Sequence, residues 1–336
     1  MKTEESFTPA PAATAADRPV IVVASGAFGD RDRLVEHFDE AVLRFCDLSD
    51  PGQLPEATAG ASGVVVTLQP LRQVHIEAFA PTVRVIGRAG VGVDTIDLDA
   101  AQASGITVVN QPAYGTREVA SHAVAMLLAL QRRICDLDAF VRGGWSGSPV
   151  LKPMKPVDEL VVGLVGNGRI GRATAEMLTG LVGQVLAFDP AYPPVPPGVE
   201  VVTDLKELLV RSDVVSLHLP LTSESAGMVD TTFLGTMAPG SLLVNVSRGG
   251  LVDETALVEA LESGHLAGAA LDVFPTEPLP KTSPLLRAGK TVLSPHVAAY
   301  SDRASWRLAS WTISDTISWV RSDEIEHGSV VVRGDR

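Results

Sequence analysis

Apolar and polar positions alternate along the chain in two series, each made of short β-branched runs separated by helical patterns. The first series extends over 19–110, where runs such as PVIVVAS, GVVVTL and ITVVN are separated by segments such as GDRDRLVEHF and DLDAAQASG. This alternation is typical of parallel strands joined by crossover helices. We therefore expect an α/β unit in this part of the chain.

A second series with the same alternation begins near residue 160. Its runs are LVVGLVG, QVLAFD, DVVSLHLP, SLLVNVS, AGAALDVF and TVLSPH. A long helix, capped by Thr116 and apolar as far as Ile134, leads out of the first series. The stretch 143–158 is rich in Gly, Pro and Ser, so it is expected to connect the two series. An amphipathic helix is expected over 301–321.

A glycine-rich turn stands between the strand VVGLV and the helix after it. Its G-x-G-x-x-G spacing permits a tight turn, close approach of the backbone to a pyrophosphate, and close packing of helix on strand. The helix N-terminus offers unpaired N–H groups to the phosphates. The alternative is a glycine-rich turn that binds nothing. We assign the turn to a dinucleotide site formed by Gly166, Gly168, Arg169, Ile170 and Gly171.

An acidic residue at the end of the next strand strengthens this interpretation. Asp189 lies 18 residues beyond Gly171, close to the roughly 20 expected for the acid that binds the adenosine ribose. A carboxylate accepts hydrogen bonds from the ribose hydroxyls and repels a 2′-phosphate. No cation follows in the next three residues. The sequence therefore favours NAD over NADP.

Composition narrows the class of protein. A length of 336 residues favours two domains, and 46% hydrophobic with 20% charged residues is the usual globular mixture. A net charge of −13 argues against nucleic acid as a partner. The apolar helical stretch 123–130 is far shorter than the ~20 residues that cross a bilayer, so no membrane span is expected.

Cysteines and the N-terminus bear on the location of the protein. Cys46 and Cys135 are too few for a disulfide framework and lack metal-ligand spacing, so we expect a cytoplasmic protein without a metal site. Residues 1–18 contain acids and no apolar block, so they are expected to be a flexible tail rather than a secretory signal.

Three ionisable residues follow apolar strands, where α/β sheets place their ligands: Arg248 in NVSRGGLVDE, Glu277 in LDVFPTEP and His296 in SPHVAAYS. Together with RAGVGVDTID at 88–97 and the glycine-rich turn, these segments resemble the D-isomer-specific 2-hydroxyacid dehydrogenase family over about 20–320. The resemblance implies NAD-dependent hydride transfer between a small D-2-hydroxy acid and its 2-keto acid.

The three residue types suit this chemistry. An alcohol proton needs a base and a carbonyl needs an acid, which histidine supplies as His296. A carboxylate, Glu277, orients the imidazole and favours its protonated form. The forked cation of Arg248 binds the substrate carboxylate and the developing alkoxide. Taken singly, such an arginine is more often a surface cation and such a histidine a loop residue, so the assignment depends on all three together.

The resemblance also assigns weaker sites. It implies that the backbone of Gly90, Val91 and Gly92 binds the substrate carboxylate. On the cofactor side, Asp272 accepts a hydrogen bond from the nicotinamide carboxamide, and the residues that line the dinucleotide are Ser247 and Pro220. Arg88, before these glycines, is expected to be a solvated arginine at a strand end.

The implied fold is α/β, with two Rossmann-like domains that each contain a parallel sheet. The substrate domain is discontinuous and flavodoxin-like, formed by 19–113 plus 299–336, and the NAD-binding domain is 114–298. The resemblance further implies a homodimer joined through the NAD-binding domains, with the helix near Thr116 at the interface.

Several alternatives stay open at this point. The segment 296–301 resembles the branch that includes the C-terminal binding proteins, but Ala299 stands where that branch has a tryptophan, and Ser121 and Asn167 also depart from the family pattern. A phosphoglycerate-, phosphonate- or phosphite-type oxidoreductase of the same fold, or an NADH-sensing scaffold, remains possible. A formate dehydrogenase is disfavoured because its relatives have glutamine at the position of Glu277.

Overall fold

The computed structural model describes residues 18–148, 154–191 and 194–335. Contacts divide the chain into two units: the first holds the chain as far as Tyr114 and again from Ser305, and the second is Gly115–Ala304. The expected domain limits stay a prediction beside this division. The expected tail lies outside the described residues, apart from Arg18.

The first unit is built on a six-stranded sheet with the order β13-β5-β4-β3-β1-β2. Strands β1 to β5 are parallel, and β13 runs antiparallel to β5 at the edge. Without β13 the order is the 2-1-3-4-5 of flavodoxin-like folds. The strands are β1 (Val20–Ala24), β2 (Val42–Cys46), β3 (Gly63–Val66), β4 (Val85–Arg88), β5 (Thr107–Asn110) and β13 (Ser329–Val332).

Helices cover both faces of this sheet, which explains why its strands are apolar runs rather than alternating patterns. Along β1, Ile21 packs with Ile313 and Ile317 of the C-terminal helix, and Val22 packs in the cluster on the other face. The helices are α1 (Arg31–His37), α2 (Leu54–Ala57), α3 (Gln73–Glu77), α4 (Leu98–Ala103) and α11 (Asp302–Ser322).

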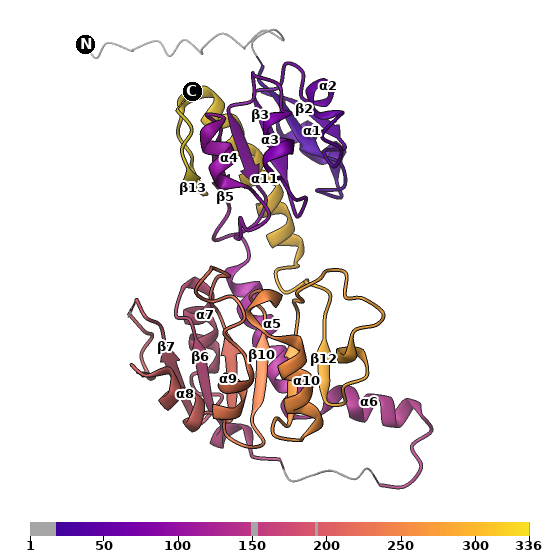
Figure 1. The fold of residues 1–336 in the computed structure, drawn as a ribbon, viewed down its shortest axis with the longest axis vertical. Helices are drawn as coiled ribbons and strands as arrows, with labels where there is room; N and C mark the ends of the chain where they lie inside the picture. The colour runs from indigo at the N-terminus through magenta and orange to yellow at the C-terminus, as the bar shows by residue number, and fades with distance from the viewer. Residues whose placement is uncertain (1–17, 149–153, 192–193, 336) are drawn as a thin grey trace, which may run out of the picture. The chain divides into compact units, whose positions relative to one another are not determined.

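The second unit is built on a fully parallel sheet with the order β12-β11-β10-β9-β6-β7-β8. Figure 1 labels β12, β10, β6 and β7 in this order. The strand order reverses between β6 and β9, which is the switch point where such sheets bind ligands. The strands are β6 (Val161–Val165), β7 (Gln184–Phe188), β8 (Val199–Val201), β9 (Val214–Leu217), β10 (Leu242–Asn245), β11 (Gly268–Leu271) and β12 (Thr291–Leu293).

The helices of the second unit lie on both faces of its sheet (Figure 1). They are α5 (Thr116–Gln131), α6 (Ile134–Arg142), α7 (Arg169–Leu178), α8 (Leu205–Arg211), α9 (Thr231–Thr236) and α10 (Glu254–Glu262), with 3-10 turns at Val157–Glu159, Gly249–Leu251 and Pro284–Leu286. Two parallel α/β sheets confirm the predicted fold class. Among the described residues, no helix is both long and apolar enough to cross a membrane.

The prediction for the long helix is wrong at both ends. Gly115, not Thr116, is the N-cap, and a Cβ at this position would lie 3.2 Å from the Cβ of Ala299. The helix ends at Gln131 because Arg133 adopts a left-handed conformation with φ 53°. Ile134 therefore begins a separate helix, α6, which has no buried residue.

Candidate active site

The predicted cofactor and catalytic residues of the second unit all follow the carboxyl ends of its strands. Because the sheet is parallel, these ends meet at one edge. The residues, in chain order, are the glycine-rich turn after β6, Asp189 after β7, Pro220 after β9, Ser247 and Arg248 after β10, Asp272 and then Glu277 after β11, and His296 after β12.

Packing distinguishes the three glycines of the turn. A Cβ on Gly166, whose φ is +100°, would overlap the carbonyl group of His218, and a Cβ on Gly171 would overlap the carbonyl oxygen of Gly166. A Cβ on Gly168 would meet no atom within 4 Å. The first and third glycines are therefore required by the protein's own packing. The second borders open space, as expected where a phosphate approaches the backbone.

The start of α7 also fits a dinucleotide. Gly168 is the N-cap and provides no side-chain hydrogen bond to the helix N–H groups. Asp189 accepts from the backbone N–H of Asn167 at 2.8 Å through Oδ2 and from that of Ala191 at 2.9 Å through Oδ1. Each carboxylate oxygen can accept a second bond, so Asp189 lies beside the turn with capacity for ribose hydroxyls.

His296 and Glu277 form a direct pair. His296 Nδ1 lies 2.7 Å from Glu277 Oε2, and the two side chains are 33% and 31% exposed. The other oxygen, Oε1, accepts from the backbone N–H of Phe274 at 2.9 Å, so the carboxylate is anchored on its own loop. Since Glu277 engages Nδ1, the imidazole presents Nε2 to any further partner. This arrangement can hold or release a proton at Nε2.

The loop that carries Arg248 packs against the loop that carries Glu277. A Cβ on Gly249 would overlap the main chain of Phe274, so only glycine permits this approach of the two backbones. The Arg248 carbonyl accepts from Asn245 Nδ2 at 2.9 Å, and its guanidinium donates to the Ser247 carbonyl at 2.8 Å. The structure therefore brings the loops of Arg248, Glu277 and His296 together.

Asp272 is fully buried, and its carboxylate binds within the protein. Oδ1 accepts from Ser294 Oγ at 2.6 Å and from the Val297 N–H at 3.0 Å, and Oδ2 accepts from the Ala298 N–H at 2.9 Å. Burial alone raises the pKa of Asp272, but hydrogen bonds from His122, Ser294 and the two amides outweigh it and lower the pKa. Its bond to the carboxamide stays a prediction.

The substrate-binding residues assigned by resemblance lie in the first unit, after β4. Gly90 has φ +144°, its carbonyl accepts from the Gln111 N–H at 3.0 Å, and the Val91 carbonyl accepts from Asn110 Nδ2 at 2.6 Å. Gly92 follows. The expectation of a solvated Arg88 is wrong: it is 4% exposed, and its guanidinium packs against Gly90 and donates to the Ala89 carbonyl.

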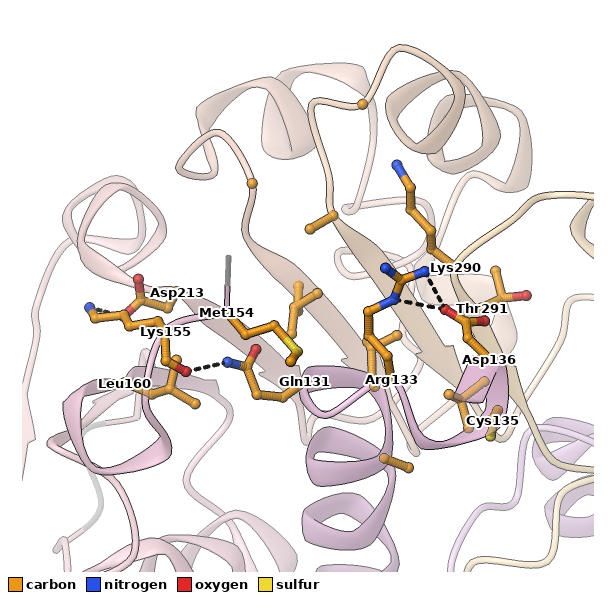
Figure 2. A pocket seen from close by; sticks show the side chains of 17 residues that line it. Gln131, Arg133, Cys135, Asp136, Met154, Lys155, Leu160, Asp213, Lys290 and Thr291 are labelled. Carbon is orange, nitrogen blue, oxygen red and sulfur yellow. Dashed lines mark hydrogen bonds and ion pairs between the residues drawn. The ribbon is translucent and has the colours of Figure 1, made fainter. Parts of the chain in front are cut away.

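A cavity of about 360 Å³ lies at the opposite edge of the second sheet (Figure 2). Its walls include residues at the amino ends of strands, such as Asp213, Leu242 and Thr291. Figure 2 shows Arg133 paired with Asp136, and Gln131 bonded to the backbone of Lys155. Four-residue strands separate it from the candidate site by roughly 13 Å. The cavity is therefore separate from the predicted chemistry.

Comparison with protein families gives one match to more than half of the chain. The family described as D-isomer specific 2-hydroxyacid dehydrogenase, NAD binding domain, matches residues 124–298. The chain is also 35% identical over 332 residues to D-3-phosphoglycerate dehydrogenase from Mycobacterium leprae, covering 95% of this chain and 60% of that protein. It thus spans less than two thirds of the length of that relative.

Two further proteins match along nearly their whole length. Glyoxylate reductase from Korarchaeum cryptofilum is 39% identical over 299 residues, covering 87% of this chain and 89% of that protein. The solved NADPH-dependent glyoxylate/hydroxypyruvate reductase from Sinorhizobium meliloti, in complex with NADP and malonate, has a TM-score of 0.84 at 29% identity, covering 95% of this chain and 99% of the other.

Proposed function

The chain belongs to the D-isomer specific 2-hydroxyacid dehydrogenase family, and from that premise we propose that it interconverts a small D-2-hydroxy acid and its 2-keto acid, with NAD as the cofactor. The observation that carries the proposal is the His296–Glu277 pair, with its 2.7 Å contact, on the same sheet edge as the glycine-rich turn. The name glyoxylate reductase indicates that the relative with this name acts on a small 2-keto acid, which supports this substrate class.

In this proposal each site residue has one role in the reaction. When bound, NAD supplies the hydride chemistry. Nε2 of His296 gives a proton to the carbonyl oxygen during reduction and takes the hydroxyl proton during oxidation. Glu277 holds the imidazole through Nδ1 and stabilises its charged form. Arg248 binds the substrate carboxylate and carbonyl as a forked cation, and the backbone of Gly90–Gly92 adds donors for the carboxylate.

NAD is favoured over NADP in this proposal because of Asp189. Its carboxylate lies at the turn that receives the adenosine half of the cofactor, where a 2′-phosphate would meet a like charge. Ser247 and Pro220 line the cofactor from the neighbouring loops after β10 and β9. Ser247 is held there by a 2.7 Å bond from its hydroxyl to the Leu217 carbonyl.

A phosphorylated hydroxy acid is a second candidate substrate. The observation that favours it is the buried cation Arg88 behind the Gly90 backbone, together with the similarity to a D-3-phosphoglycerate dehydrogenase. The two candidates differ in the substrate that turns over fastest. A panel containing glyoxylate, hydroxypyruvate, larger 2-keto acids and 3-phosphohydroxypyruvate, each assayed with NADH, separates them.

A homodimer joined through the second units is the proposed assembly, with α5 at the interface. Support comes from α6, which follows α5 and exposes Ile134 at 55% and Val141 at 49%. An isolated nine-residue helix is marginal in water, so apolar side chains of α6 that stay exposed in the described part of the chain favour a contact with another copy. Light scattering at micromolar concentration tests this, and a monomer contradicts it. The two free cysteines fit a cytoplasmic protein.

The central experiment is His296→Asn assayed on the same panel in both directions. We expect turnover to fall by at least ~10²-fold, because acid–base catalysis typically contributes that much or more, while the NADH dissociation constant stays close to that of the parent. His37→Asn, an exposed histidine of α1, is the matched control. If His296→Asn keeps most of the keto-acid reductase activity, the proposed mechanism is wrong.

A further inference from the structure

The turn that carries His296 is held from behind by the second unit. His296 has φ +55°, a left-handed backbone conformation that non-glycine residues adopt only when their surroundings enforce it. Its backbone N–H donates to the Asp272 carbonyl at 2.7 Å. The next two N–H groups, of Val297 and Ala298, donate to the Asp272 carboxylate. The direction of the imidazole therefore depends on where the Asp272 carboxylate lies.

Ser294 fixes that carboxylate. Its hydroxyl lies 2.6 Å from Asp272 Oδ1, and its own N–H is bonded to the Leu271 carbonyl at 3.0 Å. The hydroxyl also lies 3.7 Å from Met126 Sδ and 3.0 Å from His122 Nε2. Ionised Asp272 accepts only, so the single hydroxyl proton of Ser294 goes to the carboxylate, which is a far better acceptor than a thioether.

The acceptor of the Ser294 hydroxyl proton determines whether Nε2 of His122 is protonated. With its proton donated to Asp272, Ser294 Oγ can only accept from His122. Nε2 of His122 must therefore carry a proton, and it also lies 3.6 Å from Asp272 Oδ1. A chain of donors thus extends from α5 through Ser294 to the Asp272 carboxylate and on to the turn of His296. None of these three groups belongs to the proposed proton transfer.

We propose that Ser294 and His122 are positioning residues for His296, acting through the Asp272 carboxylate on the backbone of Val297 and Ala298. They hold the left-handed turn that keeps Nδ1 of the imidazole on Glu277. The consequence for turnover rests on the proposed function, whereas the effect on the turn does not. Sequence reasoning did not single out either residue: Ser294 opens the segment SPHVAAYS and His122 follows Ser121, but the two are 172 positions apart and nothing in the sequence indicates that they meet.

The first test needs no substrate. In Ser294→Ala, the amide hydrogens of Val297 and Ala298 should exchange with solvent at least about tenfold faster than in the parent, because the carboxylate that holds them loses a charge-assisted bond. Val297 is informative because its side chain is exposed, so a slow amide there reflects the bond to Asp272. Ser294→Thr, which retains the hydroxyl, should restore slow exchange.

Ser241→Ala is the matched control. Ser241 is a buried serine next to a strand of the second sheet, whereas Ser294 is half-buried. Ser241 precedes β10 at the opposite edge, and its hydroxyl has no hydrogen-bond partner among the described residues. Its variant should leave exchange at Val297 and Ala298 unchanged. Exchange in Ser294→Ala within twofold of the parent at both amides would overturn the proposal.

The nitrogen spectrum of His122 provides a second readout in the intact protein. In the parent at neutral pH, Nε2 should show the chemical shift of a protonated ring nitrogen, and this signal should change in Ser294→Ala. An unprotonated Nε2 in the parent contradicts the donor chain, because Ser294 would then have to give its proton to His122 instead of Asp272.

Kinetics then separates positioning from a general structural role. Ser294→Ala should lower kcat for keto-acid reduction at least about tenfold, as expected from losing one charge-assisted hydrogen bond, with the NADH dissociation constant unchanged and with kcat restored in Ser294→Thr. Fast amide exchange with an unchanged kcat would disprove positioning. If the parent turns over no member of the panel, the proposed function fails, while the exchange measurement still decides whether Ser294 holds the turn.

Discussion

In the first unit, β1 leads through Gly26 and Gly29 into α1, and Asp47 follows the neighbouring strand β2. In the second unit, β6 leads through Gly166 to Gly171 into α7, and Asp189 follows the neighbouring strand β7. Asp47 lies 18 residues beyond Gly29, and Asp189 lies 18 beyond Gly171. Two strand–turn–helix segments of similar pattern thus occupy equivalent places in the two sheets.

The packing of their glycines differs. A Cβ on Gly26 or on Gly29 would meet no atom within 4 Å, so packing requires neither glycine, although Ala27 and Phe28 between them contact the core of the first unit. Gly166 and Gly171, by contrast, are packed so closely that no larger residue fits. The two packed glycines therefore let the second turn lie directly against neighbouring backbone, while the space beside Gly168 stays open to a ligand.

The helix ends differ as well. Asp30 caps α1 and accepts from the Arg33 N–H at 3.1 Å, so a carboxylate already occupies this N-terminus. Gly168 leaves the N-terminus of α7 without a side-chain cap. Asp47 accepts from the Ser49 N–H in its own loop, whereas Asp189 reaches across to the turn after β6. Open N–H groups and an acid aimed at the turn distinguish the dinucleotide site.

Among tests of the difference between the two turns, Gly166→Ala should have the largest effect. The new Cβ would overlap the His218 carbonyl, and the alanine would have to adopt a strained positive φ. The free energy of unfolding of the second unit should therefore fall by about 3 kcal/mol or more. The affinity for NADH should fall more than about a hundredfold. Gly26→Ala, also at positive φ but in open space, should cost only about 1 kcal/mol and leave NADH binding unchanged. Urea unfolding and NADH titration measure both, and equal effects would refute the distinction.

His218, directly beneath the packed turn, predicts a pH effect. Burial lowers its pKa from 6.5 to about 4. The unfolded chain therefore binds a proton between pH 6.5 and 4 that the folded chain refuses, so stability is full above pH 6.5 and falls as the pH drops. The loss should reach about 3 kcal/mol at pH 4. In urea unfolding, the free energy of unfolding of His218→Gln should change less with pH than that of the parent, by this same amount. His37→Gln should show the same pH dependence as the parent. Identical profiles in parent and His218→Gln would contradict the burial effect.

Gly168→Asp would give α7 the cap that α1 has. The backbone at Gly168 is extended and a Cβ meets nothing within 4 Å, so the fold should tolerate the change and gain a few tenths of a kcal/mol. NADH affinity should fall about tenfold to a hundredfold, because the carboxylate takes the helix N–H groups and repels phosphate. Calorimetric titration and a thermal melt measure the two effects. Gly168→Ala separates bulk from charge, and undiminished NADH binding by Gly168→Asp would remove α7 from the cofactor site.

The sequence predicted the strands and the glycine-rich turn well, because buried parallel strands are continuous apolar runs and their order places motif residues at one edge. The glycine spacing at 166–171 differs from that at 26–29, but the sequence could not show what packs on Gly26 and on Gly166. Asp189 and Asp47 share the same spacing, and only the hydrogen bond to Asn167 across the sheet separates them.

Features that depend on distant pairing were not predicted. β13 adds a strand of four residues to β5, with Val330 opposite Val109. Its β-branched run is like those of the predicted strands, but nothing in the sequence indicates its distant antiparallel partner. Asp315 of α11 accepts from Gln111 at 2.7 Å and from the Gly328 N–H at 2.7 Å, which anchors the segment before β13. Such contacts depend on the whole fold. The resemblance of 296–301 to one branch of the family stays a prediction.

The smallest expected effect among these tests of the two turns concerns the choice between NADH and NADPH. Asp189→Asn removes the charge and retains one oxygen, which can accept from the Asn167 N–H, so the turn after β6 should keep its shape while the bond from the Ala191 N–H is lost. NADPH should then bind better relative to NADH, with the ratio of dissociation constants shifting about tenfold, because the 2′-phosphate no longer meets a carboxylate. Asp47→Asn, the equivalent change in the first unit, should shift neither constant. Titration of both cofactors into the parent and the two variants provides the measurement. A parent that binds NADPH as tightly as NADH, or an Asp189→Asn ratio equal to that of the parent, would mean that Asp189 holds the turn without selecting the cofactor.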